Sequence, residues 1–159
     1  MAASGLAFLW LASLIPSGRL GMTAVAGLFP MAALLVSGRN AGFLCWGASG
    51  LLSLILLPDK GISILYLVFF GLYPVVKERI EALRMLPIEW GLKLIYFNAA
   101  LTLIWTVFRA LFLPSLPAWL AGNAVLLYLL GNLIFVVYDI GLSKLIALLR
   151  VRLRFDKRI

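Results

Sequence analysis

The chain has 159 residues, of which 64% are hydrophobic and only 13% are charged, and its mean hydropathy is +1.10. Soluble domains are about 45–50% apolar, and a chain this short cannot bury such an excess in a water-soluble core. The composition therefore predicts an integral membrane protein with no soluble domain. The net charge of +8 does not indicate nucleic-acid binding, because the basic residues stand at the ends of apolar segments, where they act as topology signals and lipid contacts.

The residues suited to catalysis are few. There is no histidine, which removes the commonest metal ligand and general base, and the single cysteine, Cys45, cannot form an intramolecular disulfide. No paired carboxylates, phosphate-binding loop or nucleophile with a neighbouring base occur in the chain. We therefore expect no enzyme activity, no metal and no cofactor.

Clusters of Gly, Pro, Asn and Asp divide the chain into helices and indicate a single transmembrane domain over residues 1–159. The predicted helices cover approximately residues 2–15, 20–36, 41–57, 62–84, 88–113 and 118–150. The first is short for a span, since about 20 residues are typical. The last is longer than a bilayer needs, and its final turns should project into the cytoplasm.

Lysine and arginine counts predict the orientation. With the amino terminus inside and six crossings, the outer side holds Arg19, Lys60 and Arg109. The inner side then holds Arg39, Lys77, Arg79, Arg84, Lys93, Lys144, Arg150, Arg152, Arg154, Lys157 and Arg158. The positive-inside rule therefore places both termini in the cytoplasm. If the first segment did not cross, five helices would remain and the carboxy-terminal half would keep its orientation.

Two of the predicted helices carry polar stripes at i, i+4, i+7 and i+11 spacing, so each stripe shares one helix face. The stripes consist of Asn98, Thr102, Trp105 and Arg109, and of Tyr128, Asn132, Phe135 and Asp139. A charge at mid-membrane costs about 2.5–3.5 kcal/mol on insertion scales, so such residues normally face protein or a water-filled cavity. We expect both stripes to face the interior of the bundle.

Depth in the membrane limits which of these groups can meet in antiparallel helices. Asp139 is too far from Arg109 and is expected to meet Lys93, or Asn98 through a hydrogen bond. Arg109 lies at the depth of Asn123. Such contacts either hold helices together, contributing roughly 0.6–2 kcal/mol each, or belong to a functional site. Glu78, Glu81 and Glu89 are predicted to lie on a solvated or headgroup-level face, among basic residues.

Small residues mark two helix faces that allow close approach. Ala41, Cys45, Ser49 and Ser53 form a face that we assign to internal packing. Ala3 and Ala7 form an A-x-x-x-A spacing near the amino terminus, which is suited either to internal packing or to docking of another membrane subunit.

Several motifs occur in an order found in one transporter family. They are the A-x-x-x-A segment ending at Pro16-Ser17-Gly18, the proline-containing run Leu28–Leu35, the turn Gly38–Gly42 and the run Ser49–Leu54. In this order, over roughly residues 3–80, the chain resembles the substrate-binding S component of energy-coupling-factor (ECF) vitamin transporters. The segment Phe70–Lys77 is similar to one in a group of small membrane proteins from Firmicutes that share this architecture.

The resemblance implies an S-component-like bundle of six helices with both termini inside, in a bacterial cytoplasmic membrane. It implies a solute site in the outer half, here drawing on Arg19, Lys60, Trp105, Arg109, Asn123 and Tyr128. Three cations near one mouth would favour an anionic solute. Ala3 and Ala7 would face the transmembrane coupling (T) subunit, which two ATPases drive.

A second function remains open on the same fold. A non-transporting scaffold, like the rod-shape-determining MreD-like proteins, would use the basic tail to bind partners or anionic lipid. The chain departs from the S components in having a very short connection after its first helix, which leaves little to close over a ligand.

Overall fold

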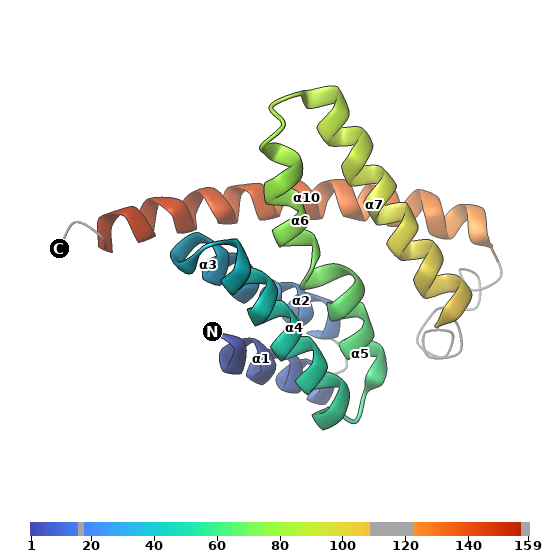
Figure 1. Cartoon of the computed structure of the whole chain (residues 1–159). Helices are drawn as coiled ribbons and strands as arrows, with labels where there is room; N and C mark the ends of the chain where they lie inside the picture. The colour runs from blue at the N-terminus through green and yellow to red at the C-terminus, as the bar shows by residue number, and fades with distance from the viewer. Residues whose placement is uncertain (16–17, 109–122, 157–159) are drawn as a thin grey trace. The chain divides into compact units, whose positions relative to one another are not determined.

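The computed structural model describes residues 1–15, 18–108 and 123–156, the last five of them by backbone alone. Every element in this part of the chain is helical, which confirms the predicted all-α class (Figure 1). The elements are α1 (Ala2–Leu14), α2 (Arg19–Ala26), α3 (Leu28–Ser37), α4 (Arg39–Leu56), α5 (Lys60–Leu65), the π-helical turn η2 (Tyr66–Phe70), α6 (Tyr73–Glu81), α7 (Leu86–Val107) and α10 (Ala124–Asp156).

Four stretches of these residues are long and apolar enough to cross a membrane: Arg19–Ser37, Lys60–Glu81, Leu86–Val107 and Ala124–Val151. Helix α1 has only 13 residues, and α4 begins with Arg39 and Asn40, which lower its hydropathy. Apolar side chains on α4 are nevertheless widely exposed, with Ile55 at 75%. The length and hydropathy of these helices are those of a multi-pass membrane protein. Six crossings and an S-component fold remain predictions.

Two predicted helices are interrupted in the structure. The helix predicted over residues 20–36 is divided at Gly27, where a Cβ atom would lie 2.1 Å from the Phe70 carbonyl oxygen. The helix predicted over 62–84 contains the π-turn and ends at Glu81. In that turn the Gly71 N–H donates to the Tyr66 carbonyl at 2.8 Å, and Pro74 has no N–H to donate to Phe70.

The remaining boundaries differ less. Pro87, which stands between the helices predicted over residues 62–84 and 88–113, lies in the first turn of α7, where a missing N–H costs no hydrogen bond. The end predicted for this helix at residue 113 and the start predicted for the last helix at residue 118 lie outside the described residues. Helix α10 continues to Asp156, six residues beyond the predicted end at Arg150.

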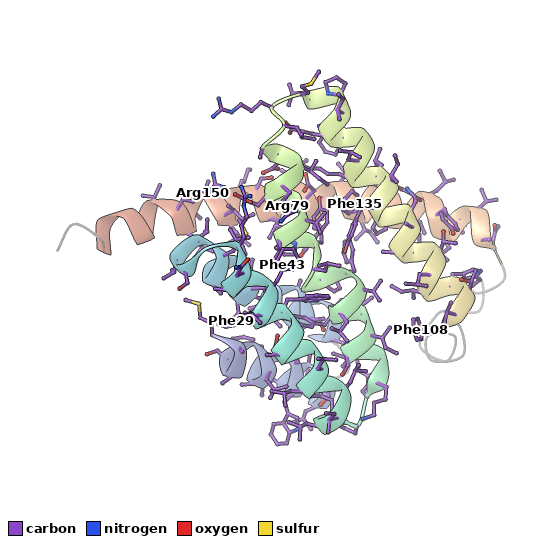
Figure 2. All side chains as sticks on the ribbon, viewed as in Figure 1. Phe29, Phe43, Arg79, Phe108, Phe135 and Arg150 are labelled. Atoms are coloured by element: carbon purple, nitrogen blue, oxygen red, sulfur yellow. The ribbon has the colours of Figure 1, made fainter. Side chains whose placement is uncertain are left out.

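The chain forms two compact units, of which the first comprises Met1–Arg79 and Leu145–Ile159. Its core contains apolar side chains of α1, α2, α5, the π-turn and the residue that follows α4: Leu9, Ala12, Ala26, Leu57, Ile62 and Tyr66. The small-residue face of α4 packs inward as predicted, with Cys45, Ser49 and Ser53 buried. Arg79 lies over the Phe43 ring, with its guanidinium carbon 5.7 Å from the ring centroid (Figure 2).

Two side chains of α4 hold the π-turn in this first unit. The Ser49 and Tyr66 hydroxyls are 2.7 Å apart. The Trp46 indole N–H donates to the Leu67 carbonyl at 3.1 Å. That carbonyl loses its usual helical donor, Gly71, to Tyr66, so the indole supplies the hydrogen bond that the π-turn removes.

The second unit comprises residues 80–144. It contains the end of α6, all of α7 and the amino-terminal two thirds of α10, the long helix at the red end of Figure 1. Many apolar side chains of α7 and α10 are exposed, including Ile95, Val107, Leu129 and Ile134. Two buried charged groups of this unit, Lys93 and Asp139, lie where the two helices meet.

Candidate functional site

A polar seam joins α7 to α10 within the second unit. We define it by seven residues: Glu81, Lys93, Asn98, Thr102, Tyr128, Asn132 and Asp139. Lys93 meets Asp139, Asn98 meets Asn132, and Thr102 meets Tyr128. The first residue of each pair rises in number as the second falls, so the helices are antiparallel. Spacings of four and seven residues put Tyr128, Asn132 and Asp139 on one face of α10, and a spacing of four puts Asn98 and Thr102 on one face of α7.

The first layer of the seam is a charged cluster. The Lys93 ammonium donates to Glu81 Oε1 at 2.8 Å and to Asp139 Oδ2 at 3.1 Å. Lys93 is only 4% exposed and Asp139 only 2%. Burying a charge is costly unless it is paired and hydrogen-bonded, and here each buried charge has an opposite partner. The sequence analysis expected Asp139 to meet either Lys93 or Asn98, and the structure pairs it with Lys93.

The sequence analysis missed Glu81 as a member of this cluster. The Glu81 side chain is still 35% exposed, but its carboxylate binds Lys93. A short turn joins α6 to α7, so Glu81 and Lys93 lie at similar depth. This short connection is the feature of the sequence that could have suggested their contact. Glu89 was also expected on the solvated face; that expectation is wrong, because its side chain is buried.

The second layer is a reciprocal amide pair. Asn98 Nδ2 donates to Asn132 Oδ1 at 3.0 Å, and Asn132 Nδ2 donates to Asn98 Oδ1 at 3.1 Å. The remaining N–H of each amide donates to the backbone of its own helix, to Leu94 O and to Tyr128 O, both at 2.8 Å. Between this layer and the charged cluster, the Phe97 and the labelled Phe135 rings stack with centroids 4.6 Å apart (Figure 2).

The third layer consists of two hydroxyls. Thr102 Oγ1 donates to the Asn98 carbonyl at 2.7 Å, which uses its one hydrogen. Its contact of 2.6 Å with Tyr128 Oη therefore has the tyrosine as donor. Tyr128 and Asn132 also line a shallow groove along α10, together with Ala124, Val125 and Leu129. This groove offers a small molecule both an apolar wall and polar atoms.

Two of the predicted ligand residues lie in the first unit and are engaged there. Arg19 pairs with Asp59 at 3.1 Å, and the other carboxylate oxygen of Asp59 accepts from the Gly61 N–H at 2.9 Å. Lys60 donates to the carbonyls of Leu54 and Leu57 at 2.6 and 2.8 Å. These contacts satisfy the carboxy-terminal end of α4, so both cations have partners within the protein.

The other predicted ligand residues belong to the second unit. Trp105 is half-buried on α7, and Tyr128 lies in the seam. Asn123 is exposed, and its Oδ1 accepts from the Leu126 N–H at 3.3 Å at the start of α10. Arg109 lies outside the described residues. The five predicted ligand residues that the structure describes are thus divided between the two units, and among these five only Tyr128 lines the groove.

The face of α1 that was predicted to dock a partner is exposed. Ala3 and Ala7 point outward with Trp10, while Gly5 faces inward, where its Cβ position lies 3.7 Å from the Phe29 side chain. The spacing of Ala3 and Ala7 therefore does not serve packing within the described part of the first unit.

Among the described residues, no group of three His, Cys, Asp or Glu side chains lies close enough together to hold a metal ion. Comparison with protein-family models, curated proteins and solved structures finds no match to this chain. The likeness to ECF substrate-binding components therefore rests only on the motifs of its first half.

Proposed function

We propose that this protein is a membrane subunit that binds a small polar solute, in the manner of the substrate-binding component of an ECF-type transporter. The observation that carries the proposal is the groove beside the seam, which brings Tyr128 and Asn132 to one recess. Ligand sites typically combine an apolar lining with a few placed polar groups. With the amino terminus inside, this end of the seam lies toward the outer face, where a solute would enter.

The seam also supports a role beyond holding the hairpin together. Ionisable groups within membrane helices are costly and commonly mark solute or ion pathways. Here Lys93 and Asp139 are almost fully buried, and the amide and hydroxyl layers continue from them to the groove. Packing of two apolar helices alone does not require six polar side chains.

The proposal can be tested by native mass spectrometry on protein purified from its own membrane. We expect a bound small molecule in the wild type and its loss in Tyr128→Phe, which removes one groove hydroxyl. Tyr66→Phe is the matched control, because it removes a buried tyrosine hydroxyl of the other unit. Wild-type protein without any small molecule would count against the proposal, as would equal retention by both variants.

A membrane scaffold is the second candidate, and the length of α10 favours it. Its 33 residues correspond to about 50 Å, whereas the hydrocarbon core is about 30 Å thick. The basic end beyond the bilayer and the exposed face of Ala3 and Ala7 would then bind other proteins. Co-purification separates the two functions, since a coupling subunit and ATPases indicate transport and cell-envelope proteins indicate a scaffold.

A further inference from the structure

We propose that the solute of this groove binds through N–H donors of its own, as a protonated amine does, and that it is not the anion that the surface cations would suggest. This inference rests on the proposed function, and it specifies the chemistry of the solute. It follows from the number of donors and acceptors that the amide and hydroxyl layers of the seam leave unused.

Every donor in these two layers is already engaged within the protein. Each of the two amides has two N–H groups, one bound to the other amide and one to a carbonyl of its own helix. The Thr102 hydroxyl donates to the Asn98 carbonyl, so the Tyr128 hydroxyl donates to Thr102. No side-chain donor of Asn98, Thr102, Tyr128 or Asn132 remains for a solute.

Acceptor capacity does remain. An amide oxygen, like a hydroxyl oxygen, accepts two hydrogen bonds. Asn98 Oδ1 and Asn132 Oδ1 each accept one from the other amide, and Thr102 Oγ1 accepts one from Tyr128. The Tyr128 oxygen only donates. Each of the four side-chain oxygens therefore keeps a free lone pair, and two of these oxygens belong to Tyr128 and Asn132, which line the groove.

The backbone determines which way the amides point. If either amide were turned over, its oxygen would face the carbonyl of Leu94 or Tyr128, which now accepts an N–H at 2.8 Å. Two acceptors at that distance repel each other, so the assignment follows from the hydrogen-bond network. The acceptor character of the groove is thus a property of the helices themselves.

An ammonium group matches this surface, because it has three donors and no acceptor. The Tyr128 ring adds a face that attracts cations, and Ala124, Val125 and Leu129 provide an apolar wall for a small hydrocarbon body. A carboxylate would instead place its lone pairs against those of Asn132 and Tyr128. The cations Arg19 and Lys60 do not offset that repulsion, since both bind groups in the first unit.

The experiment compares isobutylammonium with isobutyrate, which share a branched carbon skeleton and differ in the sign of charge. Saturation-transfer NMR on the full chain in lipid nanodiscs detects weak binding of either probe. We expect binding of the amine, weakened about tenfold by Tyr128→Phe, because a hydrogen bond to a charged group is lost. Tyr66→Phe should bind the amine as the wild type does.

Binding of isobutyrate in preference to the amine, with the same sensitivity to Tyr128→Phe, would overturn the inference and leave the proposed function standing. Amine binding that Tyr128→Phe does not change would also overturn it, because the solute would then lie elsewhere. If neither probe binds and the purified protein carries no solute, the proposed function fails together with the inference.

Discussion

Hydrogen-bond satisfaction decides what individual residues of the seam contribute. Asn98 and Asn132 each make two donated bonds and one accepted bond. In a membrane the alternative partner is hydrocarbon, so an amide that loses its counterpart keeps an unpaired polar group. The net stabilisation from the two amide–amide hydrogen bonds is therefore smaller than the destabilisation expected when one amide is removed and the other is left unpaired.

A double-mutant cycle on this amide pair tests that asymmetry. Asn98→Leu and Asn132→Leu should each lower the free energy of unfolding by about 1–2 kcal/mol, because the remaining amide loses its partner. The double variant should cost less than the sum of the two, since no amide is left unpaired. Unfolding of the purified protein in mixed micelles by a denaturing detergent measures all three values. Strictly additive single effects would show that the two amides do not interact in the membrane.

At the scale of elements, the π-turn and the break at Gly27 act together. Gly27 ends α2 and lies against the backbone of Phe70, the last residue of the turn. Trp46 and Tyr66 then attach the turn to α4. Two backbones can approach this closely only where one residue lacks a Cβ atom, so the glycine determines how the two segments pack.

Gly27→Ala should therefore destabilise the first unit. The new methyl carbon would lie 2.1 Å from the Phe70 carbonyl oxygen, and backbone atoms cannot move aside as a flexible side chain can. Overpacking of this kind costs about 1–3 kcal/mol. Gly21→Ala is the matched control in the same helix, because nothing lies within 4 Å of its Cβ position, and it should be neutral or stabilising. Thermal unfolding in detergent compares the two variants; equal melting temperatures would contradict the packing described.

These elements show what the sequence could predict. Helix periodicity and antiparallel order are local rules, and they placed Asn98 on one polar stripe, Asn132 and Asp139 on the other, and Lys93 at the depth of Asp139. The contact of Gly27 with Phe70 joins segments more than 40 residues apart, and no local pattern encodes it. The sequence therefore predicted a continuous helix where the structure has two.

The predicted ligand set shows a second limit. The resemblance to the ECF components implied a solute site in the outer half that would draw on Arg19 and Lys60. In the structure Asp59 and the carbonyls of α4 bind them instead. Composition reveals that a charge is present, but only tertiary contacts reveal whether a partner within the chain already satisfies it. Which donors and acceptors of the seam remain unused likewise depends on individual hydrogen bonds, and residue spacing does not determine these.

At the scale of the whole molecule, the open question is how many times the chain crosses the bilayer. Four stretches of the described residues qualify by length and hydropathy, whereas α4 does not, although Leu44 and Ile55 on it are more than 70% exposed. Exposed aliphatic side chains of this kind fit a lipid environment better than water. The orientation with both termini inside also requires α4 to cross, because Arg39 and Lys60 then lie on opposite sides.

Cysteine labelling of intact cells tests whether α4 crosses. Cys45 is the single native cysteine and is buried, so Cys45→Ala provides a background without a competing thiol. Asn40→Cys places an exposed thiol in the first turn of α4, and Pro58→Cys places one just beyond its last residue. A membrane-impermeant maleimide should label Pro58→Cys in intact cells, and Asn40→Cys only after the cells are permeabilised, because the positive-inside rule retains Arg39 in the cytoplasm. Labelling of both positions from the same side would mean that α4 does not span, and the reverse pattern would mean that the orientation is inverted.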